Sequence, residues 1–331
     1  MAKEPRSHVR KRRRGCFSGC LVNILLILGV AALLFVGAHV LGLVKNDPET
    51  GAPSLDLSGV GISGLPEIAL PQIDFERLSL PSWAYGVEGA GLTVKTLRTT
   101  GGEAVLVCCD GYTMLLGSGE NGLVTCAQLA LCGVRELSAA IAMSLEEGQI
   151  GGMDTVVGLY KPTYLLFPDS QTKTTAYNDM IEKAQKNGAT QLIAPERGLT
   201  FSLGRATVMV IGPTYEKHRD ERDDGLSVRV SYGNTNVLIM GTITEAGERE
   251  IHAAGSPLAA DAIICARGGS EEATGSVLVD ASLPKIALMT GKNPANSVKV
   301  RLRRVGCEIY TAKEYGVMTL NSDGQTVSMK P

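Results

Sequence analysis

The sequence predicts an α/β protein in which two mixed sheets pack face to face with helices outside, preceded by one transmembrane helix. Beyond residue 91, strand patterns alternate with helix patterns in both halves of the chain, an order typical of sheets covered by helices. Residues 21–44 form an apolar run of 24 residues, enough for a helix of about 36 Å that would cross a bilayer. A length of 331 residues with 44% hydrophobic side chains excludes a wholly disordered chain.

The N-terminal residues 1–20 are basic and are predicted to lie in the cytoplasm. Residues 1–15 carry seven Lys or Arg and one Glu, a charge of +6, so the rest of the chain carries -8. Because basic residues directly precede the apolar run, which extends from Leu21 to Val44, the positive-inside rule leaves the N-terminus inside. We therefore expect a single-pass protein of the cell membrane with an extracellular C-terminal domain. A cleaved signal peptide is the alternative, although its apolar region is usually about 7 to 15 residues long.

Residues 45–90 are predicted to be a linker or stalk. They contain five prolines and several glycines, which leave no sustained helical period. The domain beyond them holds six cysteines without zinc-ribbon spacing, and the neighbours Cys108 and Cys109 would point to opposite faces of one strand. Cys265, in an apolar run, is predicted to be a buried thiol that acts as a small hydrophobic residue.

The predicted elements of the domain follow from its apolar periodicity. Asp110 and Gly111 are a hairpin signal between two of the strands, and Gly188 stands where the cap of the clearest helix is expected. Strands are expected at residues 92–97, 104–109, 112–116, 137–143, 163–167, 191–194, 206–211, 227–232, 236–240, 261–266, 285–289 and 307–310. Helices are expected at residues 124–131, 153–160, 174–187, 245–254 and 297–305.

The segment MSLEEGQIGG, residues 143–152, resembles the motif SHxHxDHxGG with which metallo-β-lactamase-type hydrolases hold two zinc ions at the end of a strand. When the two segments are aligned on their final Gly-Gly, the four ligand positions fall on Ser144, Glu146, Gly148 and Gln149. The resemblance implies a metallo-β-lactamase-type αββα sandwich from which these metal ligands have been lost. The two adjacent glutamates of the segment are expected to lie on an extended loop and to diverge.

Further motifs are similar to those of the extracellular metallo-β-lactamase-type domain of ComEC-type DNA-internalisation proteins of the competence system. Residues 98–103, RTTGGE, replace the family's DVGQGD, while residues 226–233, 238–242 and 260–270 echo SLVLRLxYG, LLTGD and ADVLKVGHHGS. The remaining family ligands then correspond to Thr242, Arg267, Gly268 and Asn293. The resemblance implies that residues 91–331 are a degenerate domain of this kind.

The histidine count supports the loss of metal independently of any alignment. A zinc hydrolase of this type needs several imidazoles, and the chain has four histidines, of which only His218 and His252 belong to the domain. Both are predicted to be solvated. We therefore predict no catalytic residue, no metal and no cofactor. The alternative is a metal-dependent phosphodiester or other ester hydrolase with an atypical zinc site, in which Glu146 could still coordinate.

A basic cluster near the C-terminus offers candidate contacts for phosphate on nucleic acid, anionic lipid or wall polymer. Its members are Lys299, Arg301, Arg303 and Arg304. The alternative is an amphipathic element whose charges are solvated. The sequence as a whole predicts a membrane-anchored pseudoenzyme that acts as a binding or scaffold module, related to DNA uptake or the cell envelope, whose protein partner it does not identify.

Overall fold

A computed structural model describes residues 44–46, 53–55, 91–170, 173–214, 218 and 220–330. The chain divides into two compact units, Met1–Ile73 and Asp74–Pro331. In the first unit, β1 (Val44–Asn46) pairs antiparallel with β2 (Pro53–Leu55), so the predicted linker is not free of strand structure. The predicted transmembrane segment, except for its last residue, lies outside the described residues. Within the described ranges, no helix has the length and apolar character needed to cross a membrane.

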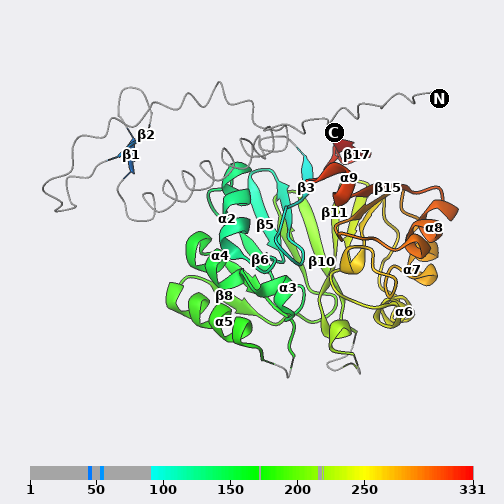
Figure 1. Cartoon of the computed structure of the whole chain (residues 1–331), viewed down its shortest axis with the longest axis horizontal. Helices are drawn as coiled ribbons and strands as arrows, with labels where there is room; N and C mark the ends of the chain where they lie inside the picture. The colour runs from blue at the N-terminus through cyan, green and yellow to red at the C-terminus, as the bar shows by residue number, and fades with distance from the viewer. Residues whose placement is uncertain are drawn as a thin grey trace, which may run out of the picture. The chain divides into compact units, whose positions relative to one another are not determined.

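The second unit contains two mixed sheets (Figure 1). The eight-stranded sheet has the order β17-β16-β3-β4-β5-β6-β7-β8, with parallel pairing from β5 to β8 and antiparallel pairing elsewhere. Its strands are β3 (Leu92–Thr96), β4 (Val105–Cys109), β5 (Tyr112–Leu116), β6 (Ala139–Ile141), β7 (Tyr164–Leu166), β8 (Gln191–Ile193), β16 (Thr319–Ser322) and β17 (Val327–Lys330).

The seven-stranded sheet has the order β15-β14-β13-β12-β11-β10-β9 and is parallel from β12 to β15. Its strands are β9 (Thr200–Leu203), β10 (Ala206–Gly212), β11 (Ser227–Tyr232), β12 (Thr235–Ile239), β13 (Ala262–Ile264), β14 (Ile286–Met289) and β15 (Glu308–Thr311). The segments between the strands include the short helices α3 (Glu147–Ile150) and α9 (Ala312–Tyr315) and the 3-10 turns η2 (Glu221–Asp224) and η3 (Ala266–Gly268).

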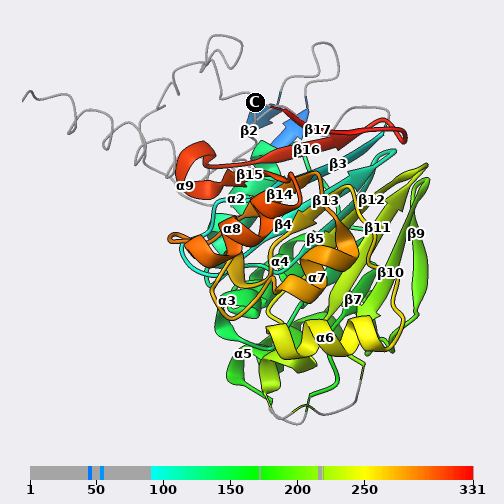
Figure 2. The same ribbon diagram turned by 90° about the vertical axis from the view of Figure 1, so that its right-hand side faces the viewer.

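Helices cover the outer face of each sheet (Figures 1 and 2). Those on the eight-stranded sheet are α2 (Gly122–Leu131), α4 (Met153–Tyr160) and α5 (Thr175–Asn187). Those on the seven-stranded sheet are α6 (Glu245–Ala253), α7 (Ser276–Ser282) and α8 (Asn296–Arg304). Three apolar cores follow from this arrangement: one between the sheets and one beneath each helical layer. The architecture is the αββα sandwich that the sequence predicts.

Side-chain alternation along β4 shows how the sequence builds these layers. Val107 and Cys109 enter the core between the sheets, whereas Leu106 and Cys108 enter the core beneath α2, α4 and α5. Both faces of the strand are therefore buried, which favours its continuous apolar sequence. The two neighbouring thiols lie on opposite faces, as predicted. The six cysteines of the described domain are buried and free, and burial raises the pKa of the Cys265 thiol.

Local turn chemistry also agrees with the sequence. Asp110 and Gly111 have positive φ angles of 52° and 84° between β4 and β5, the conformation that the Asp-Gly pair predicts for a two-residue hairpin. Helix α5 begins after Thr174, whose hydroxyl accepts a hydrogen bond from the amide of Tyr177 at 3.1 Å, and ends at Gly188 with φ 69°.

Candidate functional site

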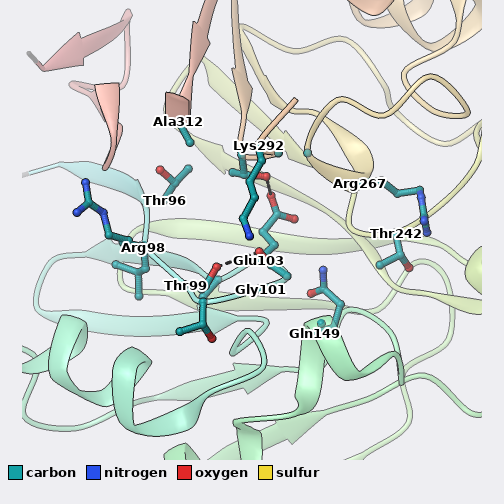
Figure 3. A pocket seen from close by; sticks show the side chains of 18 of the residues that line it. Thr96, Arg98, Thr99, Gly101, Glu103, Gln149, Thr242, Arg267, Lys292 and Ala312 are labelled. Carbon is teal, nitrogen blue, oxygen red and sulfur yellow. Dashed lines mark hydrogen bonds between the residues drawn. The ribbon is translucent and has the colours of Figure 1, made fainter. Parts of the chain in front are cut away.

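A cavity of about 690 Å³ opens where the loops after several strands meet (Figure 3). Loops that follow β6, β12, β13 and β14 reach it, and these strands belong to the parallel parts of the two sheets. Ligands of α/β proteins characteristically bind at the carboxyl ends of such strands. The segment between β3 and β4 and the short helix α9 complete the wall. The cavity is the candidate site of the domain.

Six of the eight positions that the motif comparison singles out line this cavity. They are Glu146, Gly148, Gln149, Thr242, Arg267 and Gly268. Ser144 lies beneath the surface, 2% exposed, and its hydroxyl accepts a hydrogen bond from the amide of Glu146 at 3.3 Å. Asn293 is exposed and is not part of the cavity wall. Loops that lie far apart in the sequence are thus brought together in one cavity.

Residues 147–150 form a helical turn, α3, where the sequence analysis expects an extended loop. The amides of Gln149 and Ile150 donate to the carbonyl of Glu146 at 2.8 and 3.1 Å, which closes the turn. The turn directs Gln149 inward: its side chain is only 5% exposed, and its amide points into the cavity (Figure 3). Its Oε1 atom is buried without a hydrogen-bond partner in the part of the chain that the structure describes.

Glu103 is a cavity residue that the sequence analysis does not select. Its carboxylate accepts a hydrogen bond from the hydroxyl of Thr290 at 2.6 Å, and burial raises its pKa to about 7, an effect that the Thr290 hydrogen bond partly offsets. The signal was present in the RTTGGE segment, because Glu103 stands where the family motif DVGQGD ends in aspartate. Glu103 therefore supplies a carboxyl group to the cavity wall.

Close backbone packing holds Glu103 in place. Its amide donates to the carbonyl of Gly148 at 3.1 Å, and its own carbonyl accepts from the amide of Gly119 at 3.1 Å. Gly102 just before it has a φ of 71°, and a Cβ atom there would lie 1.6 Å from the carbonyl oxygen of Gly148. Only glycine permits this approach between the β3–β4 segment and α3.

Arg267 faces the cavity from η3 with a backbone conformation that is uncommon for a residue with a side chain. Its φ is 52°, and its amide donates to the carbonyl of Gly241 at 2.8 Å. One guanidinium nitrogen lies 3.6 Å from a carboxylate oxygen of Glu146, longer than a hydrogen bond. The Nε atom is buried and has no partner among the described residues. The Arg267 side chain is 26% exposed, so its terminal guanidinium nitrogens, and not Nε, are open to the cavity.

Three further cations line the cavity: Arg98, Lys292 and Lys313. None of them forms an ion pair with another described residue. Figure 3 shows Lys292 extending into the cavity, with Arg98 and Arg267 on opposite sides of it in that view. The lining thus holds four cationic groups against two carboxyl groups, one of which is partly protonated near neutral pH.

These residues do not fit the zinc pair that the fold family uses. Within the described ranges, no group of three or more His, Cys, Asp or Glu side chains is placed to hold a metal ion. Zinc prefers imidazole and thiolate ligands, and the cavity wall offers neither. The cationic groups of Arg267 and Lys292 would moreover repel a metal cation.

The two histidines of the domain lie outside the cavity wall. The prediction that His218 is solvated is wrong. Its ring is buried between two carboxylates, 2.9 Å from Asp224 and 2.7 Å from Glu250. The error arose because the charged sequence around His218 suggested a solvated loop, whereas one of those charges, Asp224, and the distant Glu250 of α6 bury the ring between them. His252 is exposed on α6, as predicted.

The predicted basic cluster lies on α8, away from the cavity wall. Arg301 pairs with Glu245 at 2.8 Å, and Arg304 pairs with Asp280. Lys299 and Arg303 form no ion pair with another described residue. Half of the cluster is therefore neutralised within the domain.

No family model and no curated protein matches the chain. Similar solved structures include the metallo-β-lactamase fold protein YhfI from Bacillus subtilis, 15% identical, with a TM-score of 0.45 and coverage of 67% of this chain and 97% of that one. The metallo hydrolase Igni18 from the archaeon Ignicoccus hospitalis is 13% identical, with a TM-score of 0.43 and coverage of 69% and 98%.

A third similar structure is Tm1679, a metal-dependent hydrolase of the β-lactamase superfamily, 10% identical, with a TM-score of 0.46 and coverage of 66% and 95%. At these identities and TM-scores, the likenesses carry no argument about activity. The strand order and the two helical layers carry the fold assignment. The architecture is consistent with the metallo-β-lactamase fold.

Proposed function

We propose that residues 91–331 form a catalytically silent metallo-β-lactamase-type domain that works as a binding module, with the cavity as its binding site. The proposal is supported by the position of the cavity, which coincides with six of the eight positions that correspond to metal ligands in the hydrolases. It is also supported by the cationic lining described above. The module would recognise a ligand without hydrolysing it.

The observation that carries the proposal is the contact between Arg267 and Glu146. In the resembling hydrolases these two positions hold metal ligands, whereas here a guanidinium group lies 3.6 Å from the carboxylate. The arginine supplies the positive charge that a metal ion would otherwise bring, but it cannot activate a water molecule as a bound metal does. With an arginine in place of a metal ion, the cavity would bind a ligand without hydrolysing it.

A hydrolysis assay tests this proposal. The purified full-length chain would be incubated with bis(p-nitrophenyl) phosphate, a p-nitrophenyl ester and single-stranded DNA, each with added zinc or manganese. We expect no turnover above that of the Glu146→Gln variant, which keeps the size of the side chain and removes its charge. Metal-dependent turnover that is lost in Glu146→Gln would refute catalytic silence.

The same assay decides the alternative function, a metal-dependent ester hydrolase with an atypical site. One observation favours that alternative, because Glu103 and Glu146 place two carboxyl groups in one cavity and carboxylates can bind metal. Against it, Glu103 is buried with a pKa raised to about 7, and Glu146 faces a guanidinium group.

The cellular setting is proposed from the sequence resemblance alone. We propose that residues 21–44 anchor the chain in the cell membrane with the domain outside, and that the module serves a DNA-uptake or cell-envelope complex. Affinity capture from membranes, with Arg267→Ala as the matched control, would test this setting. Recovery of competence or envelope proteins by both variants would indicate a scaffold role that does not use the cavity.

A further inference from the structure

We propose that the cavity binds a phosphorylated ligand through Arg267, Lys292 and Arg98, the ligand being a polyphosphate or a terminal phosphate monoester. This inference rests on the proposed binding function and names the ligand class for the same cavity. The shared chemistry is a multiply charged phosphate group. It could be carried by a free nucleotide or by the end of a nucleic-acid strand.

The charge distribution is the first argument. Residues 16–331 carry -8, yet four cationic side chains converge on this one cavity. Elsewhere in the domain, described cations commonly have carboxylate partners, such as Arg205 with Asp110 and Lys285 with Asp261. Gathering like charges around a concave site costs free energy, and it focuses a positive potential that an anion would relieve.

Unused hydrogen-bond donors are the second argument. Arg267 is held in a positive-φ conformation, its Nε atom is buried without a described partner, and its contact with Glu146 is too long for a hydrogen bond. Gln149 adds no unused donor, because its unpartnered atom is the acceptor Oε1. Guanidinium groups bind phosphate oxygens with two parallel hydrogen bonds, and the Arg267 side chain is 26% exposed at the cavity, so its terminal nitrogens suit a phosphate group.

The size of the cavity is the third argument. Its volume of about 690 Å³ falls within the range of about 300 to 1,000 Å³ that is usual for small-molecule sites. A single inorganic phosphate would fill a small part of it. Because the cations enter from different loops, a ligand with several charged oxygens contacts more of them than a single planar carboxylate can.

The α8 surface is a poorer phosphate site than the cavity. Arg301 and Arg304 are paired with acidic residues, and Val300 is 64% exposed beside them. Arg303 is exposed there and has no described ion pair, so it provides a matched control: a cation of the same domain that lies outside the cavity.

Calorimetric titration of the purified full-length chain tests the inference. The probes are pyrophosphate, a nucleoside monophosphate, a nucleoside triphosphate, and one short oligonucleotide with and without a 5′-phosphate, with citrate as a non-phosphate polyanion. We expect pyrophosphate to bind with a dissociation constant in the micromolar range. Arg267→Ala and Lys292→Ala should each weaken binding at least tenfold, and Arg303→Ala should leave it within twofold. Nucleotide binding would identify a free nucleotide as the source, and a preference for the 5′-phosphorylated strand would identify a strand end.

Several results would overturn the inference: no binding of any phosphate probe, equal binding of citrate, or equal loss of binding in Arg303→Ala. Circular dichroism of each variant separates unfolding from loss of a contact, and the exposed Lys292 offers a substitution that does not disturb the core. Assaying released phosphate in the same samples distinguishes the two proposals. If a phosphate probe binds and phosphate is released, the proposal of catalytic silence is wrong and the phosphate site stands. If no probe binds and no phosphate is released, the phosphate site is wrong and catalytic silence stands.

Discussion

At the residue scale, two buried carboxyl groups show how the domain accommodates charge. Glu103 accepts one described side-chain hydrogen bond, from Thr290, whereas Glu248 accepts two backbone hydrogen bonds, from Thr274 and Gly275. Burial raises the pKa of each to about 7. Both groups therefore take up a proton on folding at mildly acidic pH, which links stability to pH.

Glu103→Gln should make the domain more stable at alkaline pH. A carboxyl pKa raised from 4.5 to about 7 means that the stabilising contribution is complete below pH 4.5 and is lost as pH rises through 7. Gln stays neutral, so the variant should gain about 3 kcal/mol over the wild type at pH 8.5 and little at pH 4.5. Urea unfolding across this range measures the difference. If the free energy of unfolding depends on pH in the same way for both proteins, burial does not raise the pKa of Glu103.

At the element scale, the start of α7 depends on a side chain from α6. The carboxylate of Glu248 accepts hydrogen bonds from the amides of Thr274 at 2.5 Å and Gly275 at 2.7 Å, and it is 1% exposed. Since Thr274 has a φ of 52°, the chain makes a tight turn there before the helix begins. The two amides would otherwise be buried without partners.

Glu248→Ala should destabilise the domain by about 2 to 4 kcal/mol, because two buried amides lose their acceptor. Arg249→Ala is the matched control on the same helix. Arg249 is exposed, and its only described ion pair, with Glu245, is 3.8 Å long, so its removal should cost less than about 1 kcal/mol. Denaturant unfolding at pH 8 measures both. Equal effects would mean that Glu248 does not support the start of α7.

The contact between Gly102 and Gly148 gives a second prediction at this scale. Gly102→Ala should cost at least about 2 kcal/mol, since a Cβ atom would meet the Gly148 carbonyl oxygen at 1.6 Å. Gly111→Ala separates conformational strain from collision, because Gly111 also has a positive φ but no atom within 4 Å, and it should cost about 1 kcal/mol. Thermal unfolding compares the two. A Gly102 variant as stable as the Gly111 variant would contradict the close approach.

Elements with a strong local period could be predicted from the sequence, and elements that depend on distant partners could not. Helix α4 agrees with the prediction, and α5 and the hairpin of β4 and β5 differ from it by one residue at most. Strand β16, with its polar sequence TLNS, has no such signal and forms because it pairs with β3. Helix α7 was missed because its apolar and β-branched residues do not suggest a helix.

At the scale of the whole molecule, the cavity is assembled from loops that the fold brings together. Six of the positions that the motif order singled out line one cavity, because each follows a strand end. The contributions of Glu103, Arg98 and Lys292 were not predicted, since their proximity depends on how the two sheets meet. Asn293 also follows a strand, β14, but it lies outside the cavity wall. The motif alignment alone therefore did not define the site.

The central claim is that cationic side chains have taken the place of a metal pair. Equilibrium dialysis of the purified full-length chain against zinc, followed by metal analysis, tests it most directly. The account predicts less than about 0.1 equivalent of zinc bound at micromolar free metal, with no gain in thermal stability. One or two equivalents of tightly bound zinc that are lost in Glu146→Gln would contradict it.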